Sequence, residues 1–397
     1  MTSVQTGIMR LKNEVALQEK FKGNIGVLCH SASIDSDYNH TLDILHSIYN
    51  NRLKKIYGPQ HGFVTDVQDN MIETDHSIHP VYKIPIYSLY SETRIPTDEM
   101  LEGIDHLFID LQDVGTRIYT YIYTMTYVLE ACANKNIEVV ILDRPNPIDA
   151  NTIEGNILDP NFASFVGRHP IPVRHALTMA EVAKMHQKFW AKDKCDLTII
   201  EMKNYKRTMN FWDTKLPYVN PSPNLPTIIG CYTFVGSVLF EGCNISEGRG
   251  TTRPLEIIGH PSFNPFTHKN EIEQIFKQLN LQGFTLREIN FHPMFQKHAG
   301  KTCQGYHIHP TDLKLFKPWM IFQVLFKYMK QTLGDDFSYK QEAYEYETEM
   351  NPADMINGTD KLRTWYDKKN EWEFLLSFEK LGHDLYLDQR KQCLIYE

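Results

Sequence analysis

Residues 103–127, GIDHLFIDLQDVGTRIYTYIYTMTY, decide the fold. The apolar run at residues 107–109 is too short for a helix, so it predicts a buried strand. Asp110 and Asp113 follow this strand in a polar loop, and an aromatic-rich helical pattern then runs from residue 119 to about residue 134. A strand that leads through a loop into a helix is half of a βαβ unit. The stretch therefore predicts an α/β protein.

Three charged side chains of this loop, Asp110, Asp113 and Arg117, are candidates for a functional site. In open α/β sheets, ligands bind at the carboxyl ends of the strands, and these residues follow such an end. A structural loop with an internal Asp–Arg ion pair is the alternative interpretation. Tyr119 lies nearest the loop and can stack on a sugar ring, although tyrosines in such a helix are more typical of a core.

Composition limits the possible classes of protein. A chain of 397 residues, 42% hydrophobic and 23% charged, is typical of one large or two ordinary globular domains. A net charge of −8 without a basic cluster argues against nucleic-acid binding, and no apolar window is long enough for a membrane span. Seven scattered cysteines without a C-x-x-C pair predict neither a zinc site nor a disulfide framework. No signal peptide is visible, so we expect a cytoplasmic protein unless an export signal has been removed.

Strand and helix patterns alternate along the first half of the chain, which predicts a mainly parallel, doubly wound sheet. Thr178 is the predicted N-cap of a helix that begins at residue 179. The expected strands are residues 24–29, 53–57, 85–90, 138–142 and 197–202, and the expected helices are residues 42–49 and 179–190.

A proline-rich stretch at residues 217–227 predicts a crossing between domains. We therefore expect a Rossmann-like domain at residues 1–223 and a smaller α+β domain at residues 224–397. In the second domain we expect helices at residues 271–279, 318–332 and 371–381, and a strand at residues 305–309.

The segment from residue 58 to residue 79 is long for an α/β connection, and long ordered loops are usually functional. Its titratable side chains can face one cleft, or the loop can be a solvated acidic surface. A metal site is a further alternative, but the spacing matches no strong metal motif. These side chains are His61, Asp66, Asp69, Glu73, Asp75, His76 and His79.

Residues 246–254, SEGRGTTRP, combine glycines, hydroxyls and two arginines before an expected helix at residues 254–258. N–H groups at a helix start with arginines nearby form an anion site, although the segment matches neither a P-loop nor GxGxxG. An inter-domain linker with surface arginines is the alternative. Asp143, at the end of the strand 138–142, is another site candidate, unless the prolines that follow it only shape a turn.

Several long motifs occur in one order along most of the chain. They are GPQHGF (58–63) followed by D-x-x-D, PIYSLYSETRIPTDEMLEGID (85–105), FIDLQDVGTRIYTYI (108–122), LDRPNPI (142–148), EGNILD (154–159), FVGRHPIPVRHALT (165–178), SPNLPT (222–227) and EGCNISEGRGTTRP (241–254). Together they resemble the exo-β-N-acetylmuramidase family, long labelled a domain of unknown function. Its characterised members are glycoside hydrolases that remove N-acetylmuramic acid from the non-reducing end of peptidoglycan fragments.

The resemblance implies a Rossmann-like N-terminal domain, a smaller C-terminal domain and an active-site cleft between them. We expect no metal and no cofactor. Rossmann-like does not imply a dinucleotide here, because the glycine fingerprint is missing. The expected partner is a peptidoglycan-derived sugar or muropeptide. A non-catalytic protein that binds muropeptides or sugar acids, and a hydrolase or transferase for a phosphorylated substrate, are the alternatives.

One motif departs from the family pattern. GPQHG usually reads GPEHG in the characterised relatives, and that glutamate is their suspected catalytic acid. Gln60 stands here instead, and an amide cannot donate a proton as a carboxylic acid does. Another carboxyl does the acid work, or the substrate differs, or the protein binds without cleaving. The catalytic candidates are Gln60, His61, Asp69, Glu73, Glu92, Asp110 and Asp113.

Substrate selection requires a local positive charge, because N-acetylmuramic acid differs from N-acetylglucosamine by a lactyl ether that carries a carboxylate. We expect Arg249 or Arg253 to bind that carboxylate, since a guanidinium grips a carboxylate at two points. Asp110 and Asp113 are expected to hold the rival Arg117. The substrate-binding candidates are Asp66, Arg117, Tyr119, Asp143, Arg249, Thr251, Thr252 and Arg253.

Overall fold

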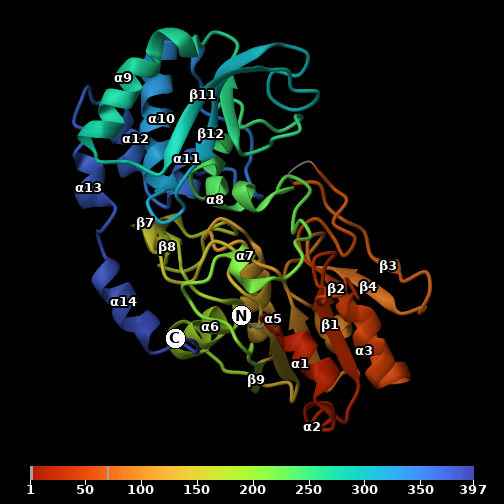
Figure 1. Ribbon diagram of the computed structural model, residues 1–397. Helices are drawn as coiled ribbons and strands as arrows, with labels where there is room; N and C mark the ends of the chain where they lie inside the picture. Colours follow the sequence, from red (N-terminus) through yellow and green to blue (C-terminus); the bar gives the residue numbers. More distant parts are fainter. Residues whose placement is uncertain (1–2, 69–70) are drawn as a thin grey trace.

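A seven-stranded sheet forms the centre of the N-terminal part of the chain (Figure 1). The computed structural model describes residues 3–68 and 71–397. The strand order is β3-β4-β2-β1-β5-β6-β9, and every neighbouring pair is parallel except β3 with β4, which confirms the predicted mainly parallel sheet. The strands are β1 (Ile25–Cys29), β2 (Leu53–Gly58), β3 (Ser77–Ile78), β4 (Pro85–Ser88), β5 (His106–Asp110), β6 (Glu138–Leu142) and β9 (Leu197–Ile200).

The central strands β1, β5 and β6 are buried on both faces, which is why they read as continuous apolar runs. Alternate side chains point to opposite faces, so Phe108 of β5 packs with α1 and α3, whereas Leu107 and Ile109 pack with α5 and α6. Thr178 caps α6 in a capping box with Glu181, as predicted. The helices of this part are α1 (Gly7–Asn13), α2 (Val15–Gln18), α3 (Thr41–Tyr49), α4 (Asp98–Leu101), α5 (Tyr121–Cys132), α6 (Met179–Phe189) and α7 (Phe211–Thr214), with the 3-10 turns η1 (Asn50–Arg52) and η2 (Pro160–Phe162).

The carboxyl ends of β2, β5 and β6 lie at one edge of the sheet, because these strands run in parallel. The loops that follow Gly58, Asp110 and Leu142 therefore emerge together, as the sequence predicted. A small hairpin of β7 (Glu154–Ile157) and β8 (Pro172–Arg174) lies between this edge and the C-terminal part (Figure 1).

An antiparallel sheet of three strands, in the order β10-β12-β11, forms the C-terminal part together with its helices. Residues 254–258 are not a helix as predicted, since β10 begins at Ile257 and the preceding residues form turns. The elements are β10 (Ile257–His260), β11 (Phe284–Phe291), β12 (Cys303–Pro310), α8 (Ile228–Ser237), α9 (Pro265–Gln278), α10 (Pro318–Leu333), α11 (Pro352–Asn357), α12 (Lys361–Tyr366), α13 (Phe374–Phe378) and α14 (His383–Lys391), with η3 (Val238–Gly242) and η4 (Gly334–Asp336).

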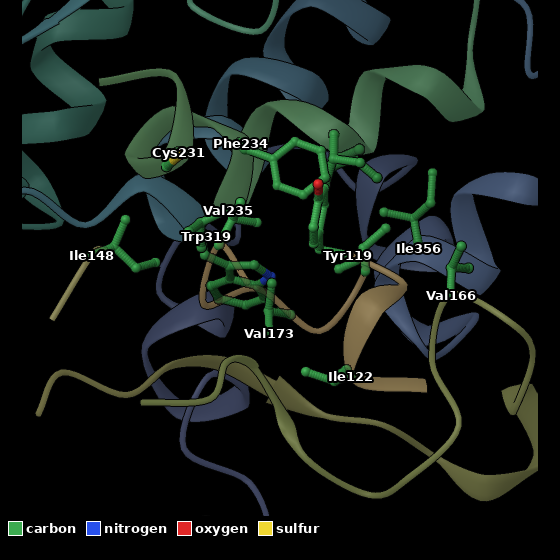
Figure 2. Packing of buried hydrophobic residues seen from close by; sticks show 14 of the residues in the cluster. Tyr119, Ile122, Ile148, Val166, Val173, Cys231, Phe234, Val235, Trp319 and Ile356 are labelled. Carbon is green, nitrogen blue, oxygen red and sulfur yellow. The ribbon is translucent and has the colours of Figure 1, made fainter. Parts of the chain in front are cut away.

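The two parts share one hydrophobic core rather than meeting across a loose interface. Figure 2 shows Trp319 of α10 and Phe234 of α8 packed with Val173 of β8 and with Tyr119, and all of them belong to one buried cluster. Burial of large apolar side chains contributes about 1.5–3 kcal/mol each. The junction is therefore a rigid support for any site built across it.

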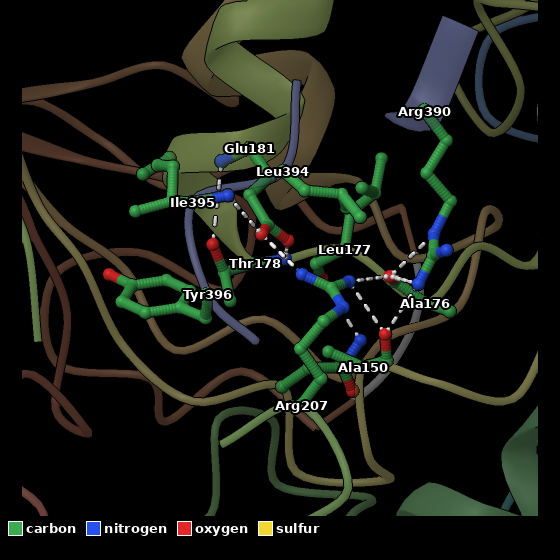
Figure 3. Close-up of polar contacts among 12 residues, drawn as sticks. Ala150, Ala176, Leu177, Thr178, Glu181, Arg207, Arg390, Leu394, Ile395 and Tyr396 are labelled. Carbon is green, nitrogen blue, oxygen red and sulfur yellow. Dashed lines mark hydrogen bonds and ion pairs between the residues drawn. The ribbon is translucent and has the colours of Figure 1, made fainter. Parts of the chain in front are cut away.

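The C-terminal strap, residues 382–397, returns to the N-terminal part (Figure 1). Figure 3 shows how it is anchored: the Arg390 guanidinium donates to the carbonyl of Ala150, 2.7 Å away, and the Ile395 amide donates to Glu181, 2.9 Å away. The expected boundary between residues 223 and 224 stays a prediction. No helix in the described ranges has the length and apolar character needed to cross a membrane.

Candidate active site

A small chamber of about 40 Å³ lies between the carboxyl edge of the large sheet and the C-terminal part. Its walls come from the loop after β2, the start of α5, helix α8, and the loops around residues 241–255 and 344–345. Apolar side chains, among them Tyr119 and Phe234, line one part of it. The polar lining residues are Gln60, His61, Thr120, Ser222, Glu241, Arg249, Tyr344 and Glu345.

Gln60 lies just past the end of β2, and its amide is fixed in one orientation. The Thr120 hydroxyl donates to Oε1, 2.5 Å away, and Nε2 donates to Oε1 of Glu345, 3.0 Å away. Because the oxygen takes the hydroxyl proton, the NH₂ group must face the carboxyl. Gln60 thus links the N-terminal part to a glutamate that lies 285 positions later in the chain.

His61 is a neutral imidazole at ordinary pH. Burial and the nearby Arg249 lower its pKa from 6.5 to about 4. Its Nδ1 lies 3.0 Å from the carbonyl oxygen of Val67, which can only accept a hydrogen bond, so Nδ1 carries the proton. Nε2 is therefore the ring nitrogen with a lone pair.

Glu345 occupies the tip of a tight turn formed by residues 344–347. Tyr344 and Glu347 exchange two backbone hydrogen bonds of 3.1 and 3.0 Å, while Glu345 and Tyr346 have φ angles of 48° and 70°. Two-residue turns of this kind favour Asn-Gly, and each non-glycine residue with left-handed backbone costs about 1–2 kcal/mol. The turn is strained, and the Glu345 carboxyl at its tip lines the chamber.

The environment of Glu345 favours its protonated form. Burial raises its pKa above the usual range, despite opposing hydrogen bonds from Tyr90, 2.7 Å away, and from Gln60. Tyr346 holds the turn in place through two contacts. The Arg94 guanidinium lies 3.4 Å from the centre of the Tyr346 ring, and the Tyr346 hydroxyl donates to Glu73, 3.1 Å away.

A second chamber-lining carboxyl, Glu241, is ionised instead. Burial would raise its pKa, but the ion pair with Arg249 at 2.5 Å and the hydrogen bond from Tyr344 at 2.8 Å outweigh burial and lower it. Arg249 also lies 3.3 Å from Glu247, yet its Nη1 is buried without a hydrogen-bond partner among the described residues. The chamber thus contains two carboxyls with opposite pKa shifts and an unused guanidinium donor.

The carboxyls at the end of β5 and in the loop after it are held in structural contacts outside the chamber lining. Asp110 is fully buried and pairs with Arg144, and Asp113 lies 3.2 Å from His175. The expectation that these aspartates hold Arg117 is wrong. Arg117 instead donates to backbone carbonyls, including those of Ile171 at 3.0 Å and Asn357 at 2.9 Å.

Asp143 lies among structural hydrogen bonds, whereas Tyr119 lines the chamber. Asp143 accepts hydrogen bonds from the Thr178 hydroxyl at 2.8 Å, the Ala180 amide at 3.0 Å and the Tyr396 hydroxyl at 2.7 Å, and burial raises its pKa to about 7. It therefore anchors the C-terminal strap. Tyr119 lines the chamber and donates to the Pro221 carbonyl at 2.8 Å.

The acidic loop after β2 does not bring all its charges into the chamber. Asp66 and Glu73 line a separate groove of about 290 Å³, and Glu92 is exposed. Asp69 lies outside the described residues. Within residues 3–68 and 71–397, no group of three or more His, Cys, Asp or Glu side chains is arranged to hold a metal ion.

Only one of the four expected anion-binding side chains, Arg249, lines the chamber. The Arg253 side chain is half-exposed and pairs with Glu256 at 3.3 Å, and the Thr251 hydroxyl donates to the Gly248 carbonyl at 2.5 Å. Thr252 lies in the same turn. Since no helix starts after this segment, the predicted contribution of helix N–H groups is wrong.

Sequence reasoning missed four residues around the chamber: Tyr90, Glu241, Tyr344 and Glu345. Glu241 belongs to a quoted motif, but nothing in its spacing indicates an inward carboxylate. Glu345 lies in EAYEYETE, residues 342–349, where alternating tyrosines and glutamates are the only signal.

A chamber at the edge of an α/β sheet with one carboxyl whose pKa is raised and one whose pKa is lowered fits the two roles that carboxyls have in a glycosidase. The chain belongs to the exo-β-N-acetylmuramidase NamZ family. The family's N-terminal sequence model matches residues 25–229 and its C-terminal model matches residues 232–396.

Relatives with known activity or structure resemble nearly the whole chain. The peptidoglycan β-N-acetylmuramidase NamZ of Bacillus subtilis (strain 168) is 38% identical over 393 residues, which are 99% of this chain and 91% of that protein. Crystal structures of two DUF1343 family proteins from Bacteroides fragilis NCTC 9343 cover 100% of this chain. One has a TM-score of 0.88 at 28% identity with all of its chain covered, and the other has a TM-score of 0.74 at 27% identity with 99% covered.

Proposed function

We propose that this protein is an exo-acting β-N-acetylmuramidase, which hydrolyses N-acetylmuramic acid from the non-reducing end of peptidoglycan fragments. Membership of the NamZ family and 38% identity to the Bacillus subtilis enzyme support this activity.

The observation that carries the substrate assignment is the buried Nη1 of Arg249, which has no hydrogen-bond partner among the described residues and belongs to a chamber-lining side chain. An unpaired buried donor is costly, and a lactyl carboxylate would satisfy it. Arg249 is thus proposed as the group that distinguishes N-acetylmuramic acid from N-acetylglucosamine. Tyr119 and His61 are proposed to contact the sugar.

Two disaccharides of opposite order test this proposal. N-acetylmuramyl-β-1,4-N-acetylglucosamine should be split into its two sugars, because the muramic residue is at the non-reducing end. N-acetylglucosaminyl-β-1,4-N-acetylmuramic acid should remain intact. Chromatography of the products distinguishes the outcomes, and cleavage of neither disaccharide, or of the second alone, would contradict the proposal.

A non-catalytic sugar-acid-binding protein is the second candidate, favoured by Gln60 at the position of the family's suspected acid. Such a protein would bind the first disaccharide in calorimetry without releasing free N-acetylmuramic acid.

The free thiol state of all seven cysteines supports the further proposal of a reducing, cytoplasmic setting.

A further inference from the structure

We propose that Glu345 is the general acid of the reaction, in the role that a glutamate at position 60 would otherwise have. The inference rests on the proposed function and deepens it. The amide of Gln60 and the carboxyl of Glu345 lie 3.0 Å apart, on opposite sides of the junction. Glu345 therefore places a carboxyl one hydrogen bond away from position 60.

Gln60 suits the role of a partner to this carboxyl. Thr120 fixes its oxygen, so only its NH₂ group faces Glu345. Two carboxyls at the same separation would repel each other once both were ionised, and they would share one proton. An amide at position 60 therefore avoids that repulsion and leaves a single titrating group at this point of the chamber.

The contacts of Glu345 are compatible with a proton on it. Its Oε2 lies 2.7 Å from the Tyr90 hydroxyl, which can accept a hydrogen bond as well as donate one. The ionised Glu241 lines the same chamber and adds a negative charge that opposes ionisation of Glu345. The carboxyl with the raised pKa and the carboxyl with the lowered pKa are thus separate residues, which is the division of roles that glycosidic cleavage needs.

Strain in the turn is a second, independent observation. Left-handed backbone at two successive non-glycine residues, Glu345 and Tyr346, persists only where surrounding contacts enforce it. The Arg94 guanidinium over the Tyr346 ring supplies that contact. Strained backbone of this kind is concentrated at active sites, where it positions a reactive side chain.

In the proposed step, the proton of Glu345 moves to the glycosidic oxygen while the bond between that oxygen and the anomeric carbon breaks. The bonding electrons stay with the oxygen, which leaves as a neutral hydroxyl. Water supplies the oxygen that ends on the anomeric carbon and releases a proton to solvent. Glu345 regains a proton from solvent before the next turnover, so the net reaction is hydrolysis.

The competing explanation is that Glu345 has only a structural role, because its hydrogen bonds also join the two parts of the molecule. Three variants of the full chain distinguish the two: Glu345→Gln, Gln60→Glu, and the double exchange Gln60→Glu/Glu345→Gln. The muramyl disaccharide and two aryl β-N-acetylmuramides, with a phenyl and a 2,4-dinitrophenyl leaving group, are the substrates. Thermal unfolding of each variant is recorded alongside.

We expect Glu345→Gln to lower kcat for the disaccharide and the phenyl glycoside at least ~100-fold, the usual scale for losing general acid catalysis. The dinitrophenyl glycoside should lose less than ~10-fold, because its leaving group needs no proton. The ratio of the two losses does not depend on the fraction of folded protein. The double exchange should recover at least ~10-fold of the disaccharide activity.

Equal losses on both aryl glycosides, or a Glu345→Gln variant within ~3-fold of wild type on the disaccharide, would overturn the assignment of Glu345. In either case the wild type would still release N-acetylmuramic acid, so the proposed function would stand. A wild type without turnover on any of the three substrates would overturn both the function and this inference.

Discussion

The side-chain amide of Gln60 donates a hydrogen bond to the carboxyl of Glu345 across a distance of 3.0 Å. The first residue follows a strand of the large parallel sheet, and the second lies at the tip of a turn in the C-terminal part. This contact closes one side of the chamber and joins the two parts at the point where we place the chemistry. Substitutions of residues around this contact and in the junction should therefore change activity or stability in predictable directions.

Tyr90→Phe should move the alkaline limb of the pH–rate profile to higher pH. The Tyr90 hydroxyl donates to Glu345 and lowers its pKa, because a hydrogen bond favours the ionised carboxylate. Without the hydroxyl the pKa rises further, so the acid stays protonated to higher pH. The measurement is kcat/KM for the muramyl disaccharide between pH 4 and 9, and a limb that shifts to lower pH would contradict the account.

Arg249→Lys should weaken binding of N-acetylmuramic acid by about 10- to 100-fold, the scale of a lost hydrogen bond to a charged group. Lysine keeps the charge that Glu241 and Glu247 need but loses the Nη1 donor. Binding of N-acetylglucosamine should change little. Titration calorimetry with both sugars measures this, and Arg253→Lys, on a half-exposed side chain, is the matched control. Equal losses for both sugars would mean that Arg249 only stabilises the junction.

Gly155→Ala should destabilise the junction core more than Gly103→Ala. Both glycines have left-handed backbone, with φ angles of 84° and 77°, so both variants carry the conformational cost of about 1–2 kcal/mol. A methyl group at position 155 would lie 2.7 Å from Val173 and 3.0 Å from Trp319, whereas position 103 has no atom within 4 Å. Overpacking should add about 1–3 kcal/mol to the first variant. Urea unfolding measures both, and equal losses would argue against a tightly packed junction.

Asp143→Asn should remove a pH dependence of stability. Burial raises the pKa of Asp143 from 3.8 to about 7, so the folded state holds the proton more tightly than the unfolded state. Its favourable contribution is complete below pH 3.8 and is lost as pH rises through 7. Relative to the variant, the wild type should lose roughly 4 kcal/mol of unfolding free energy between pH 4 and 8. Urea unfolding across this range tests it, and a difference that is constant with pH would show that Asp143 is ionised throughout.

The large sheet could be predicted because its signals are local. Short apolar runs bounded by polar loops marked β1, β2, β5, β6 and β9, and parallel strands necessarily share a carboxyl edge. The error at residues 254–258 has the same origin, because a short apolar run alone does not distinguish a strand from a helix.

The partners of the candidate residues could not be predicted, because they come from distant parts of the chain. Asp110 lies at the carboxyl end of its strand, as the last residue of β5 rather than in the loop after it, but the Arg144 that neutralises it belongs to another loop. Glu345 was missed because residues 344–347 lack the Asn-Gly signal of a two-residue turn, so local preference argues against the observed conformation. Tertiary packing, through Arg94 and Tyr346, overrides that preference.

A crystal structure of the Glu345→Gln variant with N-acetylmuramic acid soaked in tests the central claim most directly. The account predicts the sugar inside the chamber, with its anomeric carbon facing the side chain at position 345 and its lactyl carboxylate within hydrogen-bond distance of Arg249. A sugar bound outside the chamber, for example in the groove lined by Asp66 and Glu73, would contradict it. So would a sugar in the chamber with its lactyl carboxylate turned away from Arg249.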